Sequence, residues 1–261
     1  MERSEHGFDP SEQKTIRPKK LLKEEVVSRL ESGENFENVV LADLNLAGLD
    51  FENKSFRGSD IRGLSLYDER QDEEGTTIFE IRTNIKGADF TDATIADLGS
   101  GTYFGKTNAE GAVFGYTESL LVRRERHHES GKAPTAEDTG GLHRFNGRDG
   151  NFKKTTWTNA DFGGNTGGFE AFFSGADFSE ATLEECDLAG IDFSETNIDG
   201  IRIIEPVSLF ELRINENQVE SLVQAIQWAD QEEQAAFLKE KNEKGSQKVL
   251  EEQFQIVVVK A

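Results

Sequence analysis

Few residues in this chain are of a type and spacing that could do chemistry. His127 and His128 stand between Glu125 and Glu129, a group that suggests metal ligands. Neighbouring residues lack the regular spacing of protein zinc sites, in which paired ligands are roughly two to five positions apart. We therefore interpret all four as part of a solvated loop, and we expect no bound metal or other cofactor.

The single cysteine, Cys186, stands in the segment CDLAG with no histidine near it in the sequence. A small apolar group fits that position, so we expect Cys186 to fill a core. Glu184 and Glu185 are neighbouring acids, but acid–base catalysis needs an environment that separates two pKa values. We expect both to face solvent on a convex surface, and we predict that the chain is not an enzyme.

Two glycine-rich stretches, GSGTYFG and DFGGNTGG, suggest loops that hold a phosphate. A phosphate-binding loop of the P-loop type continues into Lys followed by Ser or Thr, between a strand and a helix. Lys106 and Thr107 do follow the first stretch, but Gly99 and Gly105 are six positions apart and not the five of a P-loop, and we see no strand-to-helix unit around either stretch. We interpret both as turns in a repeating structure.

A period of five residues organises most of the chain. Residues 34–68 divide without a gap into ENFEN, VVLAD, LNLAG, LDFEN, KSFRG, SDIRG and LSLYD. The central residue is always Phe, Leu or Ile, often preceded by Asn or Asp and often followed two positions later by Gly. This period fits neither an amphipathic helix nor a half-buried strand. The pattern resumes over 83–97, 102–116 and 150–205, and we expect Pro206 to end it.

These segments resemble the pentapeptide-repeat family, whose consensus is a small residue, Asp or Asn, Leu or Phe, a polar residue and Gly. The resemblance covers about two thirds of the chain. It implies an all-β solenoid, a right-handed quadrilateral β-helix in which four pentapeptides make one square coil. The central residue and the residue two before it would face inward. About six coils, each rising roughly 4.8 Å, would give a rod of about 30 Å.

The repeat and its interruptions divide the chain into segments. We expect a disordered N-terminus over 1–20, a capping helix over 21–33, the β-helix over 34–206 and a helical C-terminal segment over 207–261. Two polar inserts, 68–82 and 118–144, should protrude as loops, where functional residues often lie. The C-terminal segment is expected to be a cap or the interface of a homodimer, through residues at helical spacing: Val219, Leu222, Val223 and Ile226.

The charge of the chain indicates which partners it can bind. Fifty acidic residues against 29 basic ones give a formal net charge of −21, which should repel nucleic acid and anionic membranes and attract basic proteins. The acids are dense after residue 160, and their simplest role is to keep a rod soluble. We also consider that they form an acidic binding face, made of Asp161, Asp177, Glu180, Glu184, Asp187, Asp192, Glu195 and Asp199.

Carboxylates along a rod of duplex width would imitate DNA phosphates and engage a cationic DNA-binding groove. The resemblance extends in architecture to quinolone-resistance members of the family, and so implies a type II topoisomerase such as DNA gyrase as the partner. The alternative is an interaction scaffold, for example a secreted bacterial effector, that acts through its tail and a basic loop cluster: Arg123, Arg124, Arg126, His127 and His128.

The expected location is the bacterial cytoplasm. One cysteine excludes an internal disulfide framework and is compatible with a reducing compartment. No apolar run reaches the length of a membrane span, and residues 1–20 lack the apolar stretch of a secretory signal. We therefore expect no membrane contact and no direct contact with nucleic acid.

Overall fold

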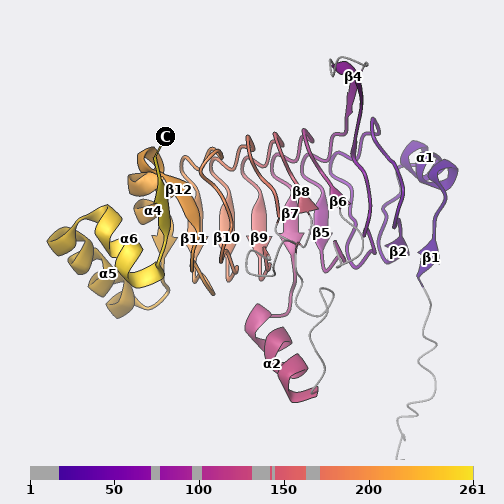
Figure 1. Ribbon diagram of the computed structural model, residues 1–261. Coiled ribbons are helices and arrows are strands. Elements are labelled where there is room, and N and C mark those ends of the chain that lie inside the picture. The colour runs from indigo at the N-terminus through magenta and orange to yellow at the C-terminus, as the bar shows by residue number, and fades with distance from the viewer. Residues whose placement is uncertain are drawn as a thin grey trace, which may run out of the picture.

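Short parallel strands and bridges stack along one axis to form a solenoid (Figure 1). The structure is a computed structural model that describes residues 18–71, 77–95, 102–130, 142, 145–162 and 171–260. Thr182 pairs with Arg202, and Asp177 pairs with Asn197, a step of twenty residues or four pentapeptides. The predicted β-helix with four pentapeptides per coil is thus confirmed, while its right-handed sense stays a prediction.

Each coil has four walls, which we number in the order in which the chain visits them. Walls 1 to 3 are held mostly by single β-bridges between residues that face outward. Val40 pairs with Asp60 on wall 1, Asn45 with Ser65 on wall 2, and Asp50 with Asn84 on wall 3. Wall 4 is a six-stranded parallel sheet of β5 (Asp89–Thr91), β7 (Val113–Gly115), β9 (Thr156–Thr158), β10 (Thr182–Glu184), β11 (Arg202–Ile204) and β13 (Ile226–Gln227).

Stacked aromatic rings fill the core behind wall 4. The ring centroids of Phe90 and Phe114 lie 5.1 Å apart with planes 3° from parallel, and Phe114 is 4.1 Å from Trp157. This spacing is close to the distance between neighbouring strands, about 4.8 Å. Flat rings on successive rungs therefore stack without a gap from Phe56 to Trp157, and Leu183 and Ile203 continue the row on the later rungs.

The corners of the coil account for the residues that follow each central position. The residue two positions after the inward one has a left-handed backbone, with φ of 54° at Asn38, 64° at Asp43 and 65° at Gly58. Gly, Asn and Asp reach this conformation at the lowest cost. A Gly two positions after Phe or Leu in the sequence therefore marks a corner of the coil.

A helix, α1 (Lys23–Glu31), lies at the N-terminal end of the coil within the segment 21–33 and buries Val26. Residues 1–17 of the predicted disordered segment lie outside the described residues. The prediction is wrong for Lys19–Lys20, because these residues form β1 and pair in parallel with β2 (Val39–Val40). Pairing needs only backbone groups, so the lysine side chains remain exposed in the solvent.

The two polar inserts contain regular structure. The first, predicted as a loop over 68–82, is an antiparallel hairpin of β3 (Tyr67–Gln71) and β4 (Thr77–Arg82) that projects from the coil (Figure 1). The second, predicted as a loop over 118–144, contains the helix α2 (Leu120–Ser130), which also stands away from the body. Between α2 and wall 2, the structure describes only Leu142. Wall 2 then continues with β8 (Phe145–Asn146), which pairs with β6 (Thr102–Tyr103).

The coil continues past Pro206, so the predicted end of the repeat is wrong. Leu209, Leu212 and Ile214 are buried, and β12 (Arg213–Asn215) pairs with the C-terminal strand β14 (Val257–Val259). Proline lacks one N–H group, and a corner tolerates this loss better than the middle of a ladder does. The cap is then built from η2 (Glu216–Gln218), α4 (Val219–Ala225), α5 (Gln231–Lys244) and α6 (Ser246–Phe254).

Candidate functional site

The eight acids predicted to form one binding face lie on four different walls. A step of five residues along the chain moves to the next wall, so acids at this spacing turn around the rod instead of lining one side. The wall 1 acids are Asp161 and Asp187, and the wall 2 acids are Asp192 and Glu195. Wall 3 carries Asp177, Glu180 and Asp199, and wall 4 carries Glu184. The single acidic face is therefore corrected to an acidic surface that encircles the rod.

Two of these acids are held by an arginine of α2. Nη2 of Arg124 lies 3.0 Å from Asp161 Oδ2 and 2.6 Å from Asp187 Oδ2. Only 11% and 12% of the two aspartate side chains are exposed. Burial opposes the charge of Arg124, but hydrogen bonds to both carboxylates raise its pKa above the ordinary arginine value. Asp161 and Asp187 therefore attach α2 to wall 1 and are not available to a partner.

Other predicted acids take part in the repeat itself. The Oδ1 atoms of Asp177 and Asp192 accept the backbone N–H groups two residues further on, at 2.8 and 2.9 Å. This is an Asx turn, which is why Asp or Asn precedes so many central residues. Asp192 also pairs with Arg213 at 3.5 Å, and Glu180 pairs with Lys153 at 3.1 Å.

The acids left for a partner are exposed and make no ion pair with any described residue. They are Glu184 on wall 4 and Asp199 on wall 3, with Glu195 on wall 2, which accepts a hydrogen bond from the Ser174 hydroxyl. These three carboxylates occupy neighbouring walls of the last coils of the solenoid. They present negative charge in several directions around its axis.

The predicted basic loop cluster is divided by the structure. Arg123 is only 5% exposed, donates to the Asn159 carbonyl and lies with its guanidinium 4.1 Å from the Tyr116 ring centroid. Burial lowers the pKa of this arginine. Arg126 is exposed and pairs with Glu118, while the His127 and His128 side chains lie outside what the structure describes. Arg123 and Arg124 therefore anchor α2, and they do not form a free basic patch.

The predicted tail interface lies inside the cap. The four residues Val219, Leu222, Val223 and Ile226 are all buried and pack into the same core as the last coils. Side chains buried within one copy cannot also form the contact surface of a dimer. Of the two roles left open for this segment, the residues serve the cap, and their assignment to a dimer interface is wrong.

Cys186 is completely buried, and its Sγ atom lies 3.4 Å from the Trp157 carbonyl oxygen. Burial raises the pKa of this thiol to about 12, which keeps it protonated and unreactive. Within the described residues, no three His, Cys, Asp or Glu side chains are grouped as they would be around a metal ion. The described helices include none with the length and apolar character needed to cross a bilayer.

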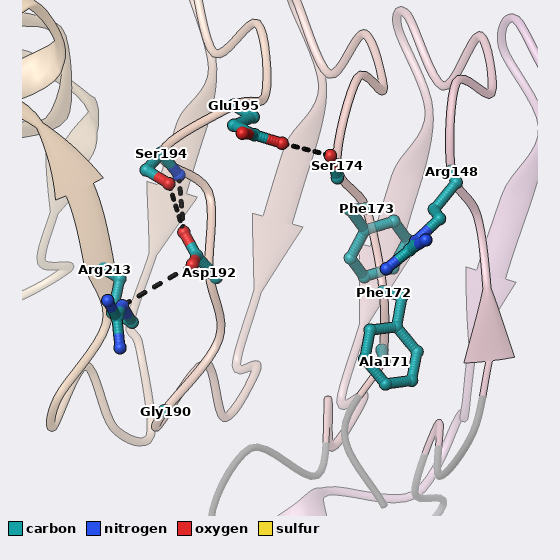
Figure 2. Close-up of a pocket in the computed structure, with 10 residues that line it drawn as sticks. All are labelled: Arg148, Ala171, Phe172, Phe173, Ser174, Gly190, Asp192, Ser194, Glu195 and Arg213. Atoms are coloured by element: carbon teal, nitrogen blue, oxygen red, sulfur yellow. Dashed lines mark hydrogen bonds and ion pairs between the residues drawn. The ribbon is translucent and has the colours of Figure 1, made fainter. Parts of the chain in front are cut away.

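A hollow of about 410 Å³ on wall 2 was not indicated by the sequence analysis. Figure 2 shows Arg148 and Phe172 at one end of it and Asp192 with Arg213 at the other. Phe172 is 42% exposed, and the guanidinium of Arg148 lies 5.5 Å from its ring centroid. The signal that could have found this site is the double Phe in EAFFSG, where the repeat calls for a polar residue before the central one.

With this geometry in view, comparison with known proteins gives one family. A model described as pentapeptide repeats matches residues 170–203 in eight copies. The chain contains pentapeptide repeats. This match covers part of the pentapeptide-repeat solenoid seen in the structure, whose register continues on both sides of it. No curated protein matches the chain.

Solved pentapeptide-repeat structures resemble this one at low sequence identity. The protein Rfr23 from the cyanobacterium Cyanothece 51142 is 15% identical, with 70% of this chain and 95% of that chain covered and a TM-score of 0.34. HetL from Nostoc sp. strain PCC 7120, described as involved in heterocyst differentiation regulation, is 18% identical over 69% and 72%, with a TM-score of 0.27. Full-length QnrB1, a plasmid-mediated fluoroquinolone resistance protein, is 16% identical over 79% and 93%, with a TM-score of 0.25.

Proposed function

We propose that this chain is a non-catalytic binding protein whose acidic rod occupies the DNA-binding groove of a basic protein. The observation that carries the proposal is the placement of exposed carboxylates on several walls of the same coils, at Glu184, Glu195 and Asp199. Phosphates surround a duplex on all sides, so charge around the circumference of a rod is the arrangement that a groove built for DNA would accept. The net charge of −21 attracts the chain to such a groove from a distance.

A type II topoisomerase such as DNA gyrase is the partner to test first, in the bacterial cytoplasm. Supercoiling by purified gyrase would be measured with increasing amounts of the chain, with and without a fluoroquinolone. The test variant carries Glu184→Gln and Asp199→Asn. The matched control carries Glu37→Gln and Glu52→Gln, which remove the same charge from exposed positions in the first coils.

We expect the wild-type chain to inhibit gyrase, or to protect it from the drug, at micromolar concentration. The test variant should need several times more protein for the same effect, and the control variant should act like the wild type. An absence of any effect at roughly 10 µM would exclude gyrase as the partner. Equal losses in both variants would mean that general charge acts, and not the acids of the last coils.

A second candidate function, an interaction scaffold, is favoured by the exposed apolar residues of α2. Leu121 and Val122 are 54% and 48% exposed on a helix that stands away from the body (Figure 1). The variant Leu121→Ser with Val122→Ser would separate the two functions in the same assay. If it abolishes the effect on gyrase while the acid variant does not, the chain acts as a scaffold through α2. The alternative of a secreted effector belongs to this second candidate function.

A further inference from the structure

Wall 2 carries an aromatic residue where the repeat places a polar one. The position before each inward residue forms an outward row along the rod. The members of this row on wall 2 are Asn45, Ser65, Tyr103, Asn146, Phe172, Asp192 and Arg213. At this position Asp or Asn makes an Asx turn that Phe cannot make. Phe172 is thus an exposed apolar residue at a place where the fold does not require one.

Phe172 lies beside the guanidinium of Arg148, for which the described residues provide no ion pair. Arg148 is exposed and packs over the Phe172 ring, 5.5 Å from the centroid. It makes no ion pair with any residue that the structure describes, in a chain that carries an excess of 21 acids. Of the two nearby carboxylates, Asp192 pairs with Arg213, and Glu195 makes no ion pair with a described residue but accepts a hydrogen bond from the Ser174 hydroxyl (Figure 2). The positive charge in the hollow therefore remains available to a ligand.

We propose that this hollow binds a peptide segment in which an acidic side chain stands next to an aromatic residue. The fork of Arg148 would receive the carboxylate through paired hydrogen bonds. The aromatic ring of the peptide would pack against Phe172, edge-on or offset, in the space above the small residues Ser174 and Gly190. The hollow shares Glu195 with the acidic surface proposed to bind a DNA-binding protein, but the two residues that would hold the peptide, Arg148 and Phe172, are not part of that surface.

The surroundings of the hollow select a carboxylate over a phosphate. Asp192 and Glu195 both line it, and they would repel a doubly charged phosphate more strongly than a single carboxylate. A nucleic acid would in addition be repelled by the net charge of the whole chain. The volume of about 410 Å³ suits two or three side chains of a short segment.

The test uses the full chain and the peptide rhodamine-Gly-Ser-Phe-Glu-Ser-Gly-amide, which carries the dye on its N-terminal amine. Binding is followed by fluorescence anisotropy at about 0.15 M salt, where the Debye length of about 8 Å screens the distant acids. The test variants are Phe172→Asn, which restores the residue type found at Asn146, and Arg148→Gln. The matched control is Tyr103→Asn, which removes an exposed aromatic from the same row of wall 2. Inorganic phosphate serves as a competitor.

We expect saturable binding to the wild type, about tenfold weaker binding to Phe172→Asn and to Arg148→Gln, and binding within about twofold of wild type for Tyr103→Asn. Replacing Glu by Gln in the peptide should weaken binding to a similar degree, and phosphate should not compete. A lack of saturation at about 1 mM peptide would overturn the proposal. So would equal binding by Phe172→Asn and Tyr103→Asn, or displacement of the peptide by millimolar phosphate.

Discussion

The left-handed corner residues show how single positions limit this fold. Several corners hold residues that are poorly suited to positive φ, among them Glu180, Glu205 and Glu211, with φ of 60°, 48° and 57°. A residue with a Cβ atom pays roughly 1 to 2 kcal/mol to adopt this conformation. Glycine avoids that cost, but it loses more backbone freedom on folding, so its net stabilisation is smaller than the strain it removes. Each such glutamate therefore carries strain that the coil must offset elsewhere.

A first prediction concerns the corner at Glu211, which is exposed. We expect Glu211→Gly to stabilise the chain by about 0.5 to 1 kcal/mol, seen as a rise in Tm of about 2 °C by circular dichroism. The control is Glu37→Gly, an equally exposed glutamate outside the positive-φ corners, which should lower Tm by a similar amount. If both changes lower Tm, corner strain is not a significant cost in this solenoid.

A second prediction concerns the thiol of Cys186, whose pKa is raised to about 12 by burial. The neutral thiol is the stable form below that pH, so at pH 8 only about one molecule in ten thousand would carry the reactive thiolate. We expect Ellman's reagent to leave the native chain unmodified for hours and to react within seconds after unfolding in guanidinium chloride. Rapid reaction of the native chain at pH 8 would show that the core opens around β10.

At the scale of elements, α2 is fixed to the coil by two arginines with different surroundings. Arg124 pairs with two nearly buried aspartates of wall 1. Arg123 is more deeply buried, and its Nε and Nη1 atoms have no hydrogen-bond partner among the described residues. Removing an arginine costs most where it leaves buried carboxylates behind, and least where an apolar chain of similar length can replace it. The two neighbouring residues should thus respond differently to the same change.

The third prediction compares Arg124→Met with Arg123→Met. We expect Arg124→Met to destabilise the chain by about 2 kcal/mol, less than for a fully buried pair because the arginine is partly exposed. Arg123→Met should cost less than about 1 kcal/mol, because removing two unsatisfied donors offsets the loss of the hydrogen bond to the Asn159 carbonyl and of the contact to Tyr116. Urea unfolding gives both values. Adding Asp161→Asn and Asp187→Asn to Arg124→Met should recover part of the loss, and failure to recover would mean that the pairing is not the cause.

At the scale of the whole molecule, a net charge of −21 on one rod produces self-repulsion. The ion pairs that oppose it are mostly between exposed side chains, such as Lys153 with Glu180 and Arg213 with Asp192, and exposed pairs contribute little. Repulsion among many acids therefore exceeds the local attractions. Salt should relieve this repulsion more than it weakens the pairs, since the Debye length falls from about 30 Å at 0.01 M to about 10 Å at 0.1 M.

The fourth prediction follows from this balance. Raising NaCl from about 10 mM to about 300 mM at pH 7 should increase Tm by a few degrees, measured by scanning calorimetry. Sorbitol at equal osmolality is the control for effects that do not depend on charge. A fall in Tm with salt would show that the ion pairs, and not the net charge, dominate the electrostatics of the solenoid.

The repeat, the inward residues and the core role of Cys186 could be predicted from the sequence, because a period of five and its corner conformations are local properties. The wall that each acid occupies depends on the stacking of the coils, since inserts lengthen the step between register partners from the 20 residues of Thr182 and Arg202 to the 34 of Ser55 and Asp89. The stacking also brings Arg124 to Asp187, 63 residues away. Such contacts depend on how coils stack, which no local pattern contains.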